Sequence, residues 1–233
     1  MKIIKIDYTN PDPVIMKKVA DAINKGKIAI VPGDAVYTIV ADAFQAEAVK
    51  KIIKIKKRES TKPFNLGLYC IDDIAKYGQF NPLIKKITKK FPKEPFTFAV
   101  PRKKNVPRFL NPMCNTLGFR IPFNKVTSML SKFHRSPVIG TSANISELKN
   151  TYSIEGLMEY FKKVFLQDVE PDIILDAGRL PSRRPSTVIE LIADKINIIR
   201  EGEIEPTILN REIDKLKENF LKNNRKDNEN FRR

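Results

Sequence analysis

Short runs of β-branched and aromatic residues alternate along this chain with longer amphipathic segments, and this alternation limits the fold more than any other feature. Residues 14–25 and 46–57 repeat apolar side chains three or four positions apart, as helices with one buried face do. Strands and helices that alternate favour one twisted sheet covered by helices. We therefore predict an α/β or α+β fold with a twisted mixed sheet. The expected strands are 28–31, 38–40, 66–69, 96–100, 137–139, 172–175, 187–191 and 196–199, and the remaining expected helices are 71–77, 82–90, 125–133 and 154–165.

The chain has 233 residues, a length that fits one domain with a short appendage. The composition changes after Pro206, where residues 208–221 keep enough apolar spacing for a surface helix and residues 222–233 are polar. A polar terminal segment has little apolar surface to bury, so we expect it to fray. The predicted division is a folded domain at 1–207 and a C-terminal helix with a basic tail at 208–233.

Charge is the most unusual part of the composition: 43 Lys and Arg against 27 Asp and Glu give a net charge of +16. Such an excess favours polyanionic partners such as nucleic acid or nucleotides. A solvated basic surface, enriched by codon bias or a hot habitat, is the alternative explanation. Charge alone does not decide between them.

Several classes of site are excluded by the residues that are scarce. Two cysteines, Cys70 and Cys114, and one histidine, His134, cannot form a four-ligand zinc site or a multi-disulfide framework. We find no signal-peptide core and no stretch long enough to span a membrane, so we expect a cytoplasmic protein with reduced thiols and no membrane partner.

Familiar catalytic motifs are also missing. The sequence has no phosphate-binding glycine loop of either common type, no nucleophile elbow and no evident pair of catalytic carboxylates. His134 stands beside Arg135 near an expected helix end, so we expect it at the surface or in a helix cap rather than in catalysis.

Cationic and hydroxyl residues gather at the ends of expected elements. Lys56, Arg58 and Lys62 follow a helix, where basic residues also serve as simple C-terminal caps. They are also spaced to converge on a polyphosphate. Ser142 and Asn144 end a strand, where small polar residues line clefts or cap a following helix. Two further clusters are Arg183-Arg-Pro-Ser-Thr187 and Arg200-Glu-Gly202.

Seven segments occur together in an order and spacing that resembles the YrdC/YciO family of threonylcarbamoyl-adenylate synthases, over about residues 10 to 205. They are Pro32-Gly-Asp-Ala-Val-Tyr37, Lys56-x-Arg58, Lys62-Pro63, Gly118-Phe-Arg-Ile-Pro122, Ser142-Ala-Asn144, Pro185-Ser-Thr-Val188 and Arg200-Glu-Gly202. The resemblance implies a basic concave cavity in a mixed sheet. It also implies a nucleotidyltransferase that joins L-threonine, bicarbonate and ATP into threonylcarbamoyl-AMP and pyrophosphate, for modification of an adenosine in certain tRNAs.

The resemblance also assigns roles to individual residues. It implies catalytic positions at Lys56, Arg58, Ser142 and Asn144; ATP contacts at Arg58, Lys62, Thr116, Ser142, Asn144 and Arg200; and threonine contacts at Arg120 and Ser186, with Arg120 binding the carboxylate. A magnesium ion that arrives with ATP is implied, whereas a structural metal is not. These cations stabilise the charge that builds on phosphate oxygens during transfer, and no covalent intermediate is needed.

The chain departs from the family pattern mainly on the side assigned to threonine. The usual Thr-Asp-Thr-Val-Tyr-Gly run is Gly33-Asp34-Ala35-Val36-Tyr37-Thr38 here, and two common histidines are replaced by Gly67 and Asn124. A pocket that lacks polar groups discriminates less against an amino acid without a hydroxyl. We therefore predict a weak preference for threonine over valine, unless other groups supply the missing contact.

Three functions remain open from the sequence. The first is the synthase itself. The second is a YciO-like protein that uses the same basic concavity to bind double-stranded RNA, tRNA or the ribosome without synthesis, because RNA shape recognition needs backbone cations. The third is the same adenylating chemistry on another amino acid.

Overall fold

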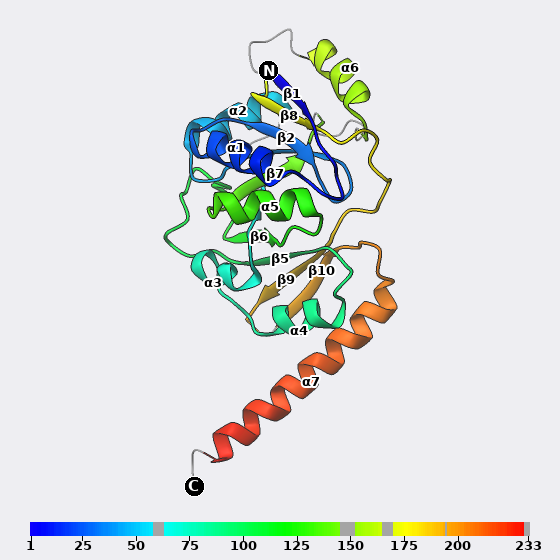
Figure 1. The fold of residues 1–233 in the computed structure, drawn as a ribbon. Helices are drawn as coiled ribbons and strands as arrows, with labels where there is room; N and C mark the ends of the chain where they lie inside the picture. Colours follow the sequence, from blue (N-terminus) through cyan, green and yellow to red (C-terminus); the bar gives the residue numbers. More distant parts are fainter. Residues whose placement is uncertain (58–62, 145–151, 165–169, 194, 231–233) are drawn as a thin grey trace.

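The computed structural model describes residues 1–57, 63–144, 152–164, 170–193 and 195–230. In these residues ten strands form one mixed sheet in the order β1-β8-β2-β3-β7-β4-β6-β5-β9-β10 (Figure 1). The strands are β1 (Lys2–Lys5), β2 (Ala29–Pro32), β3 (Tyr37–Asp42), β4 (Asn65–Gly67), β5 (Phe96–Pro101), β6 (Thr116–Arg120), β7 (Val138–Ser142), β8 (Ile173–Asp176), β9 (Thr187–Ile192) and β10 (Lys195–Arg200). The helices are α1 (Pro13–Asn24), α2 (Ala46–Lys56), α3 (Ile74–Tyr77), α4 (Leu83–Lys90), α5 (Lys125–His134), α6 (Ile154–Val164) and α7 (Pro206–Asn230), with a 3₁₀ turn at Ile71–Asp73. The predicted mixed α/β sheet is confirmed.

Two apolar cores lie on opposite faces of the sheet, and the side-chain alternation of β2 shows how they are separated. Ile28 and Ile30 belong to the larger core, whereas Ala29 and Val31 point into the smaller one. Helices α1 and α5, which lie side by side in Figure 1, cover the smaller core. A strand buried on both faces reads as a continuous apolar run, which is why the sequence predicts β2 so clearly.

Strand pairing brings distant segments to one place. β3 is antiparallel to β7, so that Thr38 lies opposite Ser142. β4 lies between β7 and β6, so that Gly67 is paired with Val138 on one side and with Arg120 on the other. The motifs that the sequence spreads over more than a hundred residues therefore meet near the middle of the sheet.

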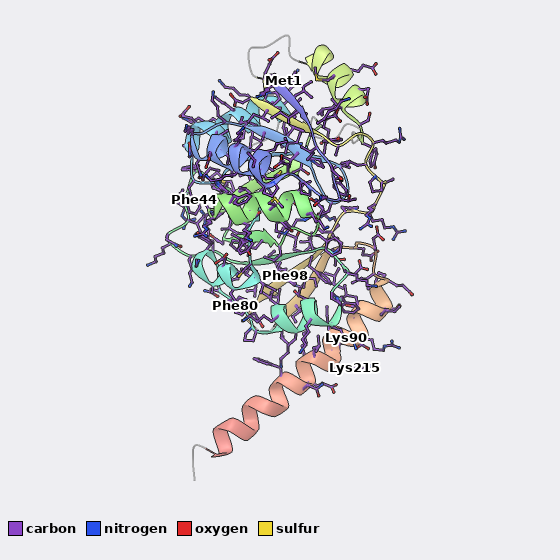
Figure 2. All side chains as sticks on the ribbon, in the orientation of Figure 1. Met1, Phe44, Phe80, Lys90, Phe98 and Lys215 are labelled. Atoms are coloured by element: carbon purple, nitrogen blue, oxygen red, sulfur yellow. The ribbon has the colours of Figure 1, made fainter. Side chains whose placement is uncertain are left out.

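Helix α7 is docked on the body by its first part and then projects away from it (Figure 1). Glu212 of α7 binds Lys90 of α4 at 3.0 Å and Lys215 of α7 at 2.9 Å, and Figure 2 shows these two lysines close together. Hydrogen bonds from Lys215 and Lys90 lower the pKa of Glu212 to about 2. The helix continues to Asn230 instead of ending at 221 as expected, because no Gly or Pro interrupts it after Pro206.

Sequence patterns missed two strands. β1 is a short edge strand in which three of four residues are exposed, and β6 contains Gly118, which weakens a strand pattern. β6 matters most, because it ends at Arg120.

The expected surface position of His134 was wrong. It is buried, with its Nε2 atom 3.4 Å from a carboxylate oxygen of Asp42. It lies on the inner face of the last turn of α5, so the cationic neighbour Arg135 does not bring it to the surface.

None of the helices in the described residues is long and apolar enough to cross a lipid bilayer.

Candidate active site

A cavity of about 480 Å³ lies over one face of the central strands and is lined by alternate residues of β3, β4 and β7. Its lining comes from the β2–β3 turn, from β3, β4, β6 and β7, from one face of α5, from the segment before β9 and from the end of β10. Alternate residues of a strand point to the same face of a sheet, so these residues form one concave surface of the kind that binds small ligands. We name two walls of the cavity after the ligands that the sequence resemblance implies for them. The nucleotide wall is Ser142 and Arg200, with Asn144 and Lys56 behind Ser142. We call Gly33, Ala35, Thr38, Gly67 and Arg120 the amino-acid wall.

Lys56 is the buried centre of the nucleotide wall, with an exposed fraction of 1%. Its ammonium donates hydrogen bonds to the backbone carbonyl oxygens of Ser142 and Asn144, both at 2.6 Å, and to Oδ1 of Asn144 at 3.2 Å. Hydrogen bonds from a charged donor are strong, and a buried ammonium must have them. Lys56 therefore fixes the end of β7 in place, through contacts with protein oxygens.

The other two members of the predicted Ser-x-Asn motif differ in exposure. The Ser142 hydroxyl donates to Oδ1 of Asn144 at 2.5 Å, and Ser142 lines the cavity. Asn144 is 7% exposed and lies behind it, against Lys56. The motif thus presents Ser142 to a ligand, while Lys56 and Asn144 hold it there.

Arg200 is the last residue of the edge strand β10 and lines the same cavity. Its Nε atom donates to the backbone oxygen of Ser186 and its Nη2 atom donates to the Ser186 hydroxyl, both at 3.0 Å. Ser186 is buried, and its hydroxyl is also 2.9 Å from that of Thr97. In this arrangement Ser186 positions Arg200, a role that the sequence did not suggest.

Arg120 lies at the end of β6 on the amino-acid wall. Its Nη2 atom is 2.6 Å from Oδ2 of Asp34, whose other oxygen accepts from the backbone and side-chain nitrogens of Asn124 at 2.8 Å each. Asn124 also caps α5 through a bond from Thr127. Asp34 and Asn124 therefore orient Arg120, whose remaining N–H groups are available to a ligand carboxylate.

Positive charge is concentrated in the cavity. Burial and the nearby Arg120 lower the pKa of the Arg200 guanidinium. Arg183, from a cluster that the sequence singled out without assigning a role, also lines the cavity and has no hydrogen bond or ion pair within the part of the chain that the structure describes. It also borders a second cavity of about 410 Å³ that shares Asp34. Guanidinium groups that repel one another across a cavity favour an anionic ligand between them.

Two glycines, Gly33 and Gly67, leave space in the amino-acid wall that neighbouring side chains fill. A Cβ atom at Gly33 would lie 2.2 Å from Oγ1 of Thr38 and 2.4 Å from the carbonyl oxygen of Val36, so this turn accepts only glycine. A Cβ atom at Gly67 would lie 2.9 Å from a methyl group of Val138. The Thr38 hydroxyl therefore occupies the space beside Gly33, and a Val138 methyl group occupies the space beside Gly67.

Among the described residues, three expected ligand contacts do not line the cavity: Thr116, Asn144 and Ser186. Thr116 begins β6 and points to the same face as Arg120, but it is not among the residues that line the cavity. Arg58 and Lys62 lie outside the described residues, and their assignment to ATP stays a prediction.

The acidic groups suit a nucleotide-borne metal rather than a protein-bound one. Asp34 is the one carboxylate among the described residues that line the larger cavity, and Arg120 and Asn124 already occupy it. Within the described ranges, no three His, Cys, Asp or Glu side chains are grouped to hold a metal ion. A magnesium ion at this cavity would need most of its ligands from a bound nucleotide's phosphates.

Comparison with known proteins gives the same assignment as the sequence motifs. The Sua5/YciO/YrdC family, described as "Telomere recombination", matches residues 21–202. A Methanocaldococcus jannaschii protein, named provisionally as a threonylcarbamoyl-AMP synthase, is 36% identical over 208 residues, which cover 87% of this chain and 94% of that protein. The mouse threonylcarbamoyl-AMP synthase is 28% identical over 76% of this chain but only 63% of its own length.

A solved structure supports the fold. The Pyrococcus abyssi Sua5 protein, crystallised with L-threonine, aligns with a TM-score of 0.77 to 0.78 in two structures; in the threonine complex the score is 0.78, at 24% identity, over 93% of this chain and 61% of that one. The family match covers most of the chain, including every strand from β2 to β10. This chain is therefore a member of the Sua5/YciO/YrdC family.

Proposed function

We propose that this protein is an L-threonylcarbamoyladenylate synthase, which makes threonylcarbamoyl-AMP and pyrophosphate from L-threonine, bicarbonate and ATP. The observation that carries the proposal is the convergence of Arg120, Arg183 and Arg200 on one cavity beside Ser142. The names of the Methanocaldococcus and mouse relatives support the same activity. Such a cavity suits a reaction whose substrates are all anionic or zwitterionic.

The nucleotide wall supplies fixed positive charge to the phosphates. Arg200 is held by Ser186 before any ligand arrives, and Lys56 holds the end of β7, so little reorganisation is needed when charge develops on the phosphates. Magnesium bound to ATP would neutralise further phosphate charge. Arg183, which lines the cavity and has no hydrogen bond or ion pair among the described residues, could bind the departing pyrophosphate.

Chemistry at the amino-acid wall begins with the free amine. The threonine nitrogen adds to bicarbonate, and water leaves, to give a carbamate. A carbamate oxygen then bonds to the α-phosphorus while the bond from that phosphorus to the bridging oxygen breaks and pyrophosphate departs. The protein must hold these groups together and exclude water, and Arg120 would anchor the threonine carboxylate.

The product is a reactive mixed anhydride that a tRNA-modifying step would consume. A net charge of +16 supports a tRNA or double-stranded RNA partner, through non-specific phosphate contacts. The alternative, RNA binding without synthesis, rests on the altered residues Ala35 and Gly67. No described feature favours it over the synthase, because the cavity and its arginines are present.

The test is incubation of the full chain with ATP, magnesium and bicarbonate and with each amino acid in turn, followed by mass spectrometry of the adenylates. We expect threonylcarbamoyl-AMP with threonine, and none when bicarbonate is removed. An adenylate with another amino acid alone would favour the third function. No adenylate with any amino acid, together with tight RNA binding, would favour the second.

A further inference from the structure

Thr38 places a hydroxyl in the space that a side chain at Gly33 would occupy. Its Oγ1 atom is 2.2 Å from the position of a Cβ atom at Gly33, although the two residues belong to different arms of the β2–β3 turn. Thr38 also lines the cavity. The hydroxyl that the sequence lacks at position 33 is thus supplied from position 38.

The orientation of Thr38 assigns its hydroxyl to one wall. Its methyl group Cγ2 lies 3.7 Å from a Cβ position at Gly140, on β7 beside Ser142, whereas its hydroxyl is turned toward Gly33. The hydroxyl therefore points toward Gly33 of the amino-acid wall, and the methyl group points toward β7.

Its hydrogen bonding determines what it can recognise. The hydroxyl donates its proton to the carbonyl oxygen of Val36 at 3.2 Å, which leaves its oxygen lone pairs as acceptors. The same carbonyl also accepts from the backbone N–H of Gly33 at 3.0 Å, so it keeps a partner without Thr38. A cavity ligand that donates a proton, such as an aliphatic alcohol, would complete the arrangement.

We propose that Thr38 is a specificity-determining residue that accepts a hydrogen bond from the side-chain hydroxyl of the amino-acid substrate. This inference rests on the proposed function. It reverses the sequence-based prediction of weak selectivity, because that prediction holds only if no other group replaces the lost contact. At Gly67 the space is filled by Val138, so Thr38 is the replacement that the described wall offers.

The test compares the wild-type chain with Thr38→Val, which keeps the shape and removes the hydroxyl, and with Thr38→Ser, which keeps the hydroxyl. Thr88→Val is the matched control: the Thr88 hydroxyl also donates to a backbone carbonyl, that of Ile84 at 2.9 Å, but on α4 and outside the cavity. For each chain, kcat/KM is measured for threonine and for valine in pyrophosphate release with ATP and bicarbonate. Affinity for the two amino acids is measured by calorimetry, which needs no turnover.

We expect Thr38→Val to lower the threonine-to-valine ratio by about tenfold, the worth of one hydrogen bond, with most of the loss on threonine. Thr38→Ser and Thr88→Val should keep the wild-type ratio. An unchanged ratio in Thr38→Val, or equal losses for both amino acids, would overturn the inference and leave Thr38 a residue of the turn.

Failure of the proposed function would look different. In that case the wild-type chain forms no adenylate, and calorimetry alone decides the role of Thr38. Equal threonine affinity in the wild type and Thr38→Val would overturn the inference there as well.

Discussion

The nucleotide wall and the amino-acid wall of the cavity are built in opposite ways. The first is made of polar side chains that protein hydrogen bonds hold before a ligand arrives. Lys56 and Asn144 are buried behind Ser142, and Ser186 holds Arg200. The second is shaped by glycines, whose spaces are filled by Thr38 and Val138. Hydrogen bonds therefore fix the charged groups of the first wall, whereas the shape of the second wall depends on the residues that pack against its glycines.

The largest effect should come from breaking the network. Lys56→Met keeps the aliphatic stem but leaves two carbonyl oxygens, those of Ser142 and Asn144, without their charged donor. We expect the free energy of unfolding, measured in urea, to fall by about 3 kcal/mol, since each unpaired buried acceptor costs roughly 1 to 3 kcal/mol.

Lys50→Met is the matched control, because Lys50 pairs with Glu47 on the exposed face of α2. It should change the unfolding free energy by no more than about 0.5 kcal/mol. If Lys56→Met and Lys50→Met have the same free energy of unfolding, the buried ammonium of Lys56 does not hold the wall together.

Changing a glycine should damage the amino-acid wall by a different route. Gly33→Ala forces a Cβ atom against both Thr38 and a backbone oxygen, and we expect a loss of about 2 kcal/mol from overpacking. In Gly140→Ala the added Cβ atom would lie 3.7 Å from its nearest neighbour, which is an ordinary contact distance. The free energy of unfolding of this variant should lie within about 1 kcal/mol of the wild-type value. Equal urea midpoints for the two variants would contradict the steric role of Gly33 in the turn.

Tyr37 precedes Thr38 and ties the turn to the segment after β8. Its hydroxyl donates to the carbonyl oxygen of Gly178 at 2.7 Å and accepts from the N–H of Ala177 at 3.0 Å. Tyr37→Phe should cost about 1 kcal/mol at neutral pH.

Alkaline pH should reduce that cost. Burial raises the pKa of Tyr37 from 10.0 to about 12, so between these values the unfolded chain has lost the phenolic proton while the folded chain keeps it. The stabilisation is complete below pH 10 and is lost as the pH rises toward 12. Unfolding measured at about pH 8 and about pH 11.5 should show a smaller gap between wild type and Tyr37→Phe at the higher pH; a constant gap would contradict this.

The smallest effect should follow a change that touches neither wall. Phe220, whose ring lies 4.7 Å from the Lys86 ammonium, is the last residue of α7 with a described contact on the body. A chain ending at Leu221 should melt within a degree or two of full length. A loss of several degrees would show that residues 222–233 also stabilise the domain.

Sequence patterns predicted the elements whose apolar period is unbroken, and they failed where other forces decide. β2, α1 and α5 were expected because their buried faces are continuous. β6 was not, because Gly118 interrupts it, and a Cβ atom there would lie 2.3 Å from the side-chain oxygen of Asn65.

At the site, spacing identified Lys56, Ser142, Ser186 and Arg200 but not the hydrogen bonds that join them. The bonds from Lys56 to β7 and from Arg200 to Ser186 join residues that are 86 and 14 positions apart. The sequence also did not predict that the Thr38 hydroxyl occupies the space beside Gly33, because only the fold of the turn brings the two residues together. Long-range contacts of this kind carry no local periodic signal.

The most direct test of the contrast between the walls is calorimetry of ATP and of threonine, each titrated into wild type, Arg200→Ala and Thr38→Val. Arg200→Ala should weaken ATP by at least about tenfold, as loss of a charged hydrogen-bond donor does, while threonine affinity changes by less than about threefold. Thr38→Val should show the reverse pattern. If both variants lose both ligands to the same extent, the cavity has no separate nucleotide and amino-acid walls, and the division of the site between them is wrong.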